Sequence, residues 1–168
     1  MSGGSTRRWV ARLGVGLVAM AVGGVGIFWI MFSSWSDLAT VDESAAAAVF
    51  AEAIARSGGG VPYVEIPADG PAVVHRELER DTPADLRRLH LLGWDPAGRR
   101  LLRIDFPFWF VKAKMTRSVN LGTLTSALSG DWQHLDLRVS EEDLQRRGPA
   151  LVLDTSRADG ARLLLWTD

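Results

Sequence analysis

The chain has 168 residues, of which 47% are hydrophobic and 23% are charged, and it contains no cysteine. This length is typical of one globular domain with a short extension. The absence of cysteine excludes disulfides, zinc–thiolate sites, thiol nucleophiles and a lipid-modified N-terminal cysteine. The net charge of −1 hides an uneven distribution. The first 36 residues contain three arginines and no acid, so all 20 acidic side chains lie in the remainder.

A continuous apolar segment runs from Leu13 to Phe32 and contains no charged side chain. Its roughly 20 residues, at about 1.5 Å each, match the hydrocarbon thickness of a bilayer, about 30 Å. Trp9, Trp29 and Trp35 lie near its two ends, at depths where interfacial aromatic rings gather. We therefore predict a transmembrane helix over residues 13–32.

The charges on either side of this segment predict its orientation. Three arginines precede it: Arg7, Arg8 and Arg12. Since the residues after it are acidic, the positive-inside rule places residues 1–12 in the cytoplasm as a basic N-terminus. Residues 33–39 then form a linker, and residues 40–168 form a periplasmic or extracellular domain. Because arginine greatly outnumbers lysine, a bias typical of GC-rich bacterial genomes, we expect a bacterial inner (plasma) membrane.

Two other interpretations of the apolar segment remain open. A cleaved signal peptide would have a hydrophobic region of about 7–15 residues and a small-x-small cleavage site. The observed segment is longer, and the sequence Ser33-Ser34-Trp35-Ser36 matches such a site poorly. The remaining interpretation is a buried helix of a soluble protein.

Small residues recur along one face of the predicted transmembrane helix. They are Gly16, Ala19, Gly23 and Gly26. Small side chains let membrane helices approach closely, so this face predicts self-association or docking to another membrane protein. The alternative is that glycine and alanine are simply common in such helices.

The outer domain begins with an amphipathic helix. Thr40 and Glu43 form a capping-box pattern, and the triple glycine 58–60 ends the helix. Apolar residues between them recur with helical spacing at Ala46, Val49, Phe50, Ala53 and Ile54. We expect this face to pack on the domain.

In the rest of the chain, short segments of alternating apolar and polar residues are separated by turn residues, as in short strands linked by turns. We predict strands at 63–66, 72–78, 86–94, 99–106, 135–139, 150–154 and 161–166. The turns at 95–98 and Asp159-Gly160 indicate hairpins, and Ser140 begins a second short helix that Gly148 and Pro149 close. The predicted fold class is α+β: one N-terminal transmembrane helix, then a small domain with six or seven strands in a mostly antiparallel sheet and two short helices.

No motif points strongly to catalysis. The three histidines, His75, His90 and His134, show no tight metal-ligand spacing. There is no nucleophile elbow and no phosphate-binding glycine loop. We therefore predict no catalytic residue, no cofactor and no metal site. The alternative is an envelope enzyme or a small-ligand-binding domain with a site near His90 and His134, where a cross-strand contact with Asp105 would raise the basicity of His90.

The aromatic stretch 106–110 is the most unusual local feature. It fits either a core strand or an exposed patch formed by Phe108, Trp109 and Phe110 that contacts a protein partner or a bilayer. Nucleic acid is an unfavourable partner because the outer domain is acidic and is predicted outside the cytoplasm. We expect a non-enzymatic, single-pass membrane protein whose outer domain binds or scaffolds another envelope protein, or associates with itself.

Overall fold

The computed structural model describes residues 33–67, 72–114, 119–120, 136–137 and 139–168. The chain divides into two units, residues 1–35 and residues 36–168. The predicted transmembrane segment 13–32 and its small-residue face lie outside the described residues. In the described part of the chain, no helix is both long enough and apolar enough to span a membrane.

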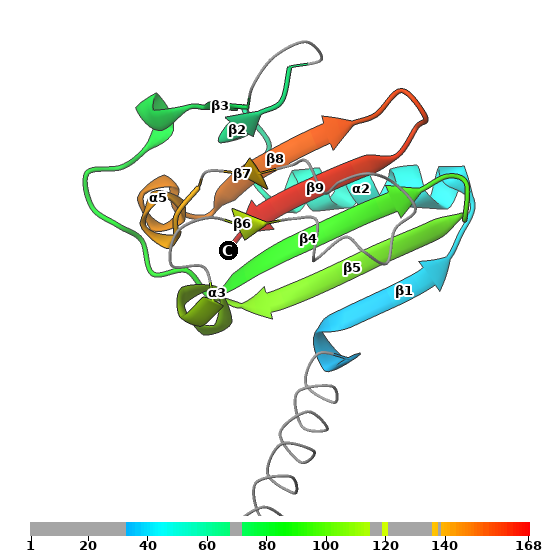
Figure 1. Ribbon diagram of the computed structural model, residues 1–168, viewed down its shortest axis with the longest axis horizontal. Coiled ribbons are helices and arrows are strands. Elements are labelled where there is room, and N and C mark those ends of the chain that lie inside the picture. Colours follow the sequence, from blue (N-terminus) through cyan, green and yellow to red (C-terminus); the bar gives the residue numbers. More distant parts are fainter. Residues whose placement is uncertain (1–32, 68–71, 115–118, 121–135, 138) are drawn as a thin grey trace, which may run out of the picture. The chain divides into compact units, whose positions relative to one another are not determined.

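The second unit is built on a seven-stranded sheet with the order β1-β5-β4-β9-β8-β2-β3 (Figure 1). Neighbouring strands pair antiparallel, except that β2 and β8 pair parallel. The strands of this sheet are β1 (Ser36–Thr40), β2 (Val64–Glu65), β3 (Val73–Val74), β4 (Arg88–Asp95), β5 (Arg100–Pro107), β8 (Ala150–Ser156) and β9 (Arg162–Thr167). A separate pair joins β6 (Val119–Asn120) to β7 (Asp136–Leu137).

Few helices accompany these strands in the described residues. They include α2 (Glu43–Arg56), α3 (Phe108–Lys114), α5 (Glu141–Arg147) and the 3₁₀ turn η1 (Arg76–Leu78). The prediction of a small α+β domain with a mostly antiparallel sheet is therefore confirmed.

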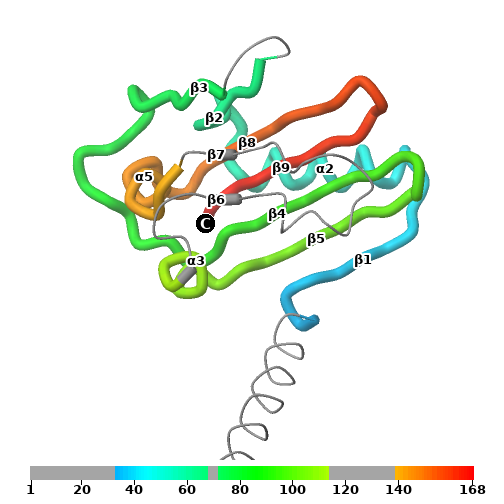
Figure 2. Tube along the Cα trace, in the orientation of Figure 1, coloured from blue at the N-terminus to red at the C-terminus, as the bar shows by residue number. Residues whose placement is uncertain are grey.

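Two hairpins form the centre of the sheet, and β4 lies next to β9 where they meet (Figure 2). The β4–β5 turn is closed by Asp95, whose carboxylate accepts a hydrogen bond from the Ala97 backbone N–H at 3.1 Å. In the β8–β9 turn, Gly160 adopts a φ of 83°, a conformation that glycine tolerates best. Both hairpins were predicted from their turn residues.

Helix α2 packs its apolar face on this sheet. Ala46, Phe50 and Ala53 are buried on the helix. They pack against buried residues of four strands, namely Leu92, Trp94, Leu101, Leu151, Leu164 and Trp166. The predicted apolar face is confirmed, but the predicted cap is wrong. Asp42, not Thr40, caps the helix by accepting a hydrogen bond from the Ala45 N–H at 2.7 Å.

Three segments differ from the sequence-based expectation. Strand β1 occupies residues 36–40 and pairs with β5, so most of the predicted linker 33–39 belongs to the sheet. Residues 76–78 form a 3₁₀ turn instead of extending a strand. The aromatic stretch leaves β5 after Pro107 and becomes helix α3, which buries Phe108 and Val111 three residues apart. A short apolar run fits strand and helix equally well, so its periodicity did not identify this helix.

The packing of α2 predicts a large effect of truncating Phe50, which is 2% exposed. Phe50→Ala leaves a cavity under the helix and should lower the free energy of unfolding by about 3–5 kcal/mol. Ala48→Ser, at an exposed position of the same helix, should change it by less than about 0.5 kcal/mol. Urea unfolding of the purified full-length chain measures both, and equal effects would contradict the packing described.

Candidate functional site

One face of the central strands is apolar at one end and polar at the other. In an antiparallel sheet, directly paired residues share a face. Leu92 and Trp94 of β4 lie beneath α2. Farther along the same face lies His90, which pairs with Asp105 of β5 and with Trp166 of β9. The helix thus covers only part of this face.

His90 is held between two carboxylates. Its Nδ1 lies 2.5 Å from Oδ1 of Asp105, and its Nε2 lies 3.1 Å from Oδ2 of Asp168. The imidazole ring also stacks on the indole of Trp166, with ring centroids 4.7 Å apart and planes within 10°. Carboxylates accept hydrogen bonds, so both ring nitrogens donate when the imidazole is protonated.

This arrangement changes the protonation of both partners. Burial by itself lowers the pKa of His90, but the hydrogen bonds that its ring makes to Asp105 and Asp168 outweigh burial and raise the pKa above its usual value of 6.5. The hydrogen bond with His90 lowers the pKa of Asp105, and the positive charges of Arg103 and Arg88 lower it further. The contacts therefore favour the protonated imidazole and the ionised carboxylate more than water does.

A pocket of about 270 Å³ opens beside this histidine. The end of α2 forms one wall, and strands β4, β5 and β9 with the residue after β9 form the rest. Its lining residues are Val49, Glu52, Ala53, Arg56, Arg88, His90, Leu92, Arg103, Asp105, Trp166 and Asp168. The lining combines apolar side chains with charged side chains of both signs.

Two of the three arginines that line the pocket are outside its ion pairs. Glu52 binds Arg56 at 2.6 Å, one helical turn apart. Among the described residues, Arg88 and Arg103 form no comparable ion pair, although both lie close enough to Asp105 to influence its pKa. The pocket is therefore suited to a ligand that offers a negative group.

The engagement of both ring nitrogens limits the chemistry of His90. A general base needs a free nitrogen within reach of the substrate proton, and here each nitrogen already faces a carboxylate. In the described residues, no group of three His, Asp or Glu side chains has the arrangement of a metal site. His134 lies outside the described residues, and His75 is paired with Glu77 and Glu65 at a distance from this pocket.

The predicted partner surface divides between core and solvent. Phe108 is 2% exposed, whereas Trp109 is 57% exposed. Phe110 is half-buried and stacks on Phe106, with centroids 5.7 Å apart. The exposed Lys112 lies over the Phe108 ring, 5.9 Å from its centroid. Helical geometry separates these neighbours, because consecutive helix residues point about 100° apart.

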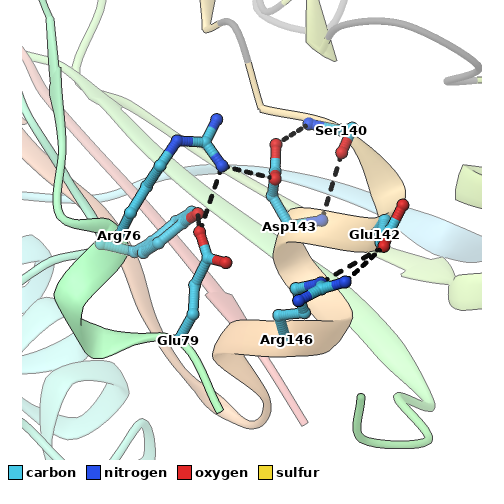
Figure 3. A network of polar contacts seen from close by, with 7 residues as sticks. Arg76, Glu79, Ser140, Glu142, Asp143 and Arg146 are labelled. Atoms are coloured by element: carbon cyan, nitrogen blue, oxygen red, sulfur yellow. Dashed lines mark hydrogen bonds and ion pairs between the residues drawn. The ribbon is translucent and has the colours of Figure 1, made fainter. Parts of the chain in front are cut away.

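A polar network joins η1 to α5 on another part of the domain (Figure 3). The Tyr63 hydroxyl donates to Glu79 at 2.6 Å, and Arg76 donates to Glu79 at 3.2 Å and to Asp143 at 2.9 Å. Asp143 also completes the capping box with Ser140 that the sequence predicted. Every one of these groups has a partner within the network, so it holds the two elements together and presents no open site.

Comparison with known protein families, curated proteins and solved structures finds no match. The class of this site is therefore defined by its own residues: a partly apolar pocket with a clamped histidine and two arginines on its rim.

Sequence reasoning paired His90 with Asp105 correctly but missed the other groups of the site. Asp168 follows Trp166 by two positions and so shares its face, but this relation matters only once β9 lies beside β4. From the sequence alone, neither Arg88 nor Arg103 was given a role in a site. The alternation of β4 and β5 was the signal that could have placed them beside His90.

The raised pKa of His90 predicts a pH-dependent contribution to stability. A histidine whose pKa is higher in the folded state stabilises the fold fully below its unfolded pKa, about 6.5, and this contribution is lost as the pH rises through the folded pKa. Asp105, with a lowered pKa, contributes above about 3.8 and loses its contribution as the pH falls through its folded pKa. The clamp, meaning the contacts of His90 with Asp105 and Asp168, thus stabilises the fold most at mildly acidic pH.

Urea unfolding midpoints of the wild type and of His90→Gln should accordingly differ most near pH 5–6 and converge toward pH 9. His75→Gln is the matched control, since His75 also lies between two carboxylates, Glu65 and Glu77, but these are exposed and solvent screens their charges. Its pH dependence should change less. A His90→Gln difference that stays constant from pH 5 to 9 would argue against the clamp.

Proposed function

We propose that the protein is a single-pass, membrane-anchored binding component of the bacterial envelope, with the domain of residues 36–168 outside the cytoplasm. The observation that carries this proposal is the pocket beside α2, where His90 is fixed by Asp105 and Asp168. A histidine held on both nitrogens shapes and charges a pocket but has no nitrogen free for proton transfer. The arrangement supports binding in preference to turnover.

The anchor in this proposal rests on the sequence. Residues 13–32 are long enough and apolar enough to cross a bilayer, and the arginines before them favour a cytoplasmic N-terminus. Because β1 begins at Ser36, only residues 33–35 would separate the end of the anchor from the sheet. The domain would thus be held within a few residues of the membrane surface.

The lack of cysteine allows a direct test of this topology. Ala48 is exposed on α2, and Ser5 lies in the predicted cytoplasmic segment. A membrane-impermeant maleimide should label Ala48→Cys on intact spheroplasts, and it should label Ser5→Cys only after the spheroplasts are lysed. Alkaline carbonate should leave the chain in the membrane pellet. Labelling in the reverse order, or release by carbonate, would overturn the anchored topology.

A second candidate function is docking of a protein partner or of a second copy through α3. The specific observation that favours it is the 57% exposure of Trp109. Large aromatic side chains are enriched at the centres of protein interfaces and are otherwise costly to leave in water.

Site-specific photo-crosslinking tests this surface in native membranes. A photoreactive residue at position 109 should yield a discrete adduct, at twice the mass of the chain if the partner is a second copy. The photoreactive residue placed instead at position 48, exposed on α2, should yield no adduct. Equal adducts at both positions, or none at position 109, would argue against docking through Trp109.

A further inference from the structure

The pocket beside α2 is lined by charged side chains of both signs, with as many arginines as carboxylates. The lining contains three arginines, three carboxylates (Glu52, Asp105 and Asp168) and His90, which is hydrogen-bonded on both ring nitrogens. Each of these carboxylates is already bound, one to Arg56 and two to His90. Among the described residues, Arg88 and Arg103 are therefore the arginines of the lining that form no ion pair.

These two arginines flank the His90–Asp105 pair. Arg103 pairs with Leu92, and Arg88 lies two residues before His90 on β4, so the pair His90–Asp105 lies between them on the same face. Both lower the pKa of Asp105, as charges near a common carboxylate do. Both are exposed to solvent, so their guanidinium groups are accessible to a ligand entering the pocket.

Part of the pocket lining is apolar. Val49 and Ala53 of α2 face it from one side, and Trp166 of β9 faces it from the sheet. The volume of about 270 Å³ exceeds the roughly 150 Å³ of a cavity that holds benzene. The space thus suits an apolar group of about that size together with a charged head.

We propose that this pocket binds a small organic anion, a carboxylate carried on an apolar body. Arg88 and Arg103 hold the carboxylate, and guanidinium groups match the planar geometry of that group. The apolar body lies against Val49 and Trp166. This inference rests on the proposed binding function and adds the chemical class of the ligand to it.

Three probes that share one body and differ only in the head group test the charge preference: 3-phenylpropanoate, 3-phenylpropan-1-ol and 3-phenylpropan-1-amine. Equilibrium dialysis of the full-length chain in nanodiscs at pH 7, with empty nanodiscs subtracted, measures each affinity. The carboxylate should bind at least about tenfold more tightly than the alcohol, with the amine weakest, as expected when a charged hydrogen bond is lost. Equal or tighter binding of the alcohol or the amine overturns the proposal.

Two neighbouring arginines give a matched control for the site. Arg88→Ala and Arg103→Ala should each weaken 3-phenylpropanoate binding about tenfold, whereas Arg87→Ala should leave it unchanged. Arg87 is exposed and adjacent in sequence but does not line the pocket. If Arg87→Ala weakened binding equally, the loss of affinity would follow from net charge alone. That result would overturn the assignment of Arg88 and Arg103 as carboxylate ligands. All three positions are exposed, so the variants are expected to fold, and urea unfolding checks that they do.

Inorganic phosphate tests the role of the apolar wall. It should compete with 3-phenylpropanoate only weakly, because it has no body to place against Trp166. Competition as strong as that of added 3-phenylpropanoate itself would overturn the apolar half of the proposal.

The failure of this inference is distinguishable from that of the proposed function. Preferred binding of the alcohol or amine leaves a binding pocket of another chemistry, whereas reversed cysteine labelling removes the anchored topology whatever dialysis shows.

Discussion

The pairing of β4 with β9 is the interaction on which the rest of the domain depends. It runs from Leu89 opposite Thr167 to Trp94 opposite Arg162 and joins two hairpins that are distant in the sequence. A single hairpin is only marginally stable in water, whereas the joined hairpins form the centre of a seven-stranded sheet. The same pairing sets Leu92 beside Leu164, which creates the apolar surface that α2 covers.

The length of α2 then decides where that surface ends. The helix stops at Arg56, and the following glycines adopt positive φ angles that end it. Beyond the helix the sheet continues with His90, which burial alone would make unfavourable as a charged group. Its two carboxylate partners offset this cost and raise the pKa of His90 at the boundary between core and solvent. The pocket is the result of a sheet that extends farther than the helix covering it.

The two surfaces proposed for binding have different physical origins. The pocket arises from incomplete cover of the sheet and combines charge with apolar wall. The exposure of Trp109 arises because β5 ends at Pro107 and the chain turns into α3, which buries Phe108 and leaves the next residue outside. Neither surface needs the other, so a ligand in the pocket and a partner at α3 are compatible proposals for one domain.

The sequence by itself determined the features that depend on neighbours along the chain. These include the two central hairpins from their turn residues, the α2 face from its spacing, the cap at Ser140, and the α+β class. Only the tertiary structure decided that β4 lies beside β9, and with it that Asp168 reaches His90 and that Arg88 and Arg103 share a pocket. The reason is that alternation along a strand fixes which residues share its face, whereas the choice of neighbouring strand depends on packing across the whole core.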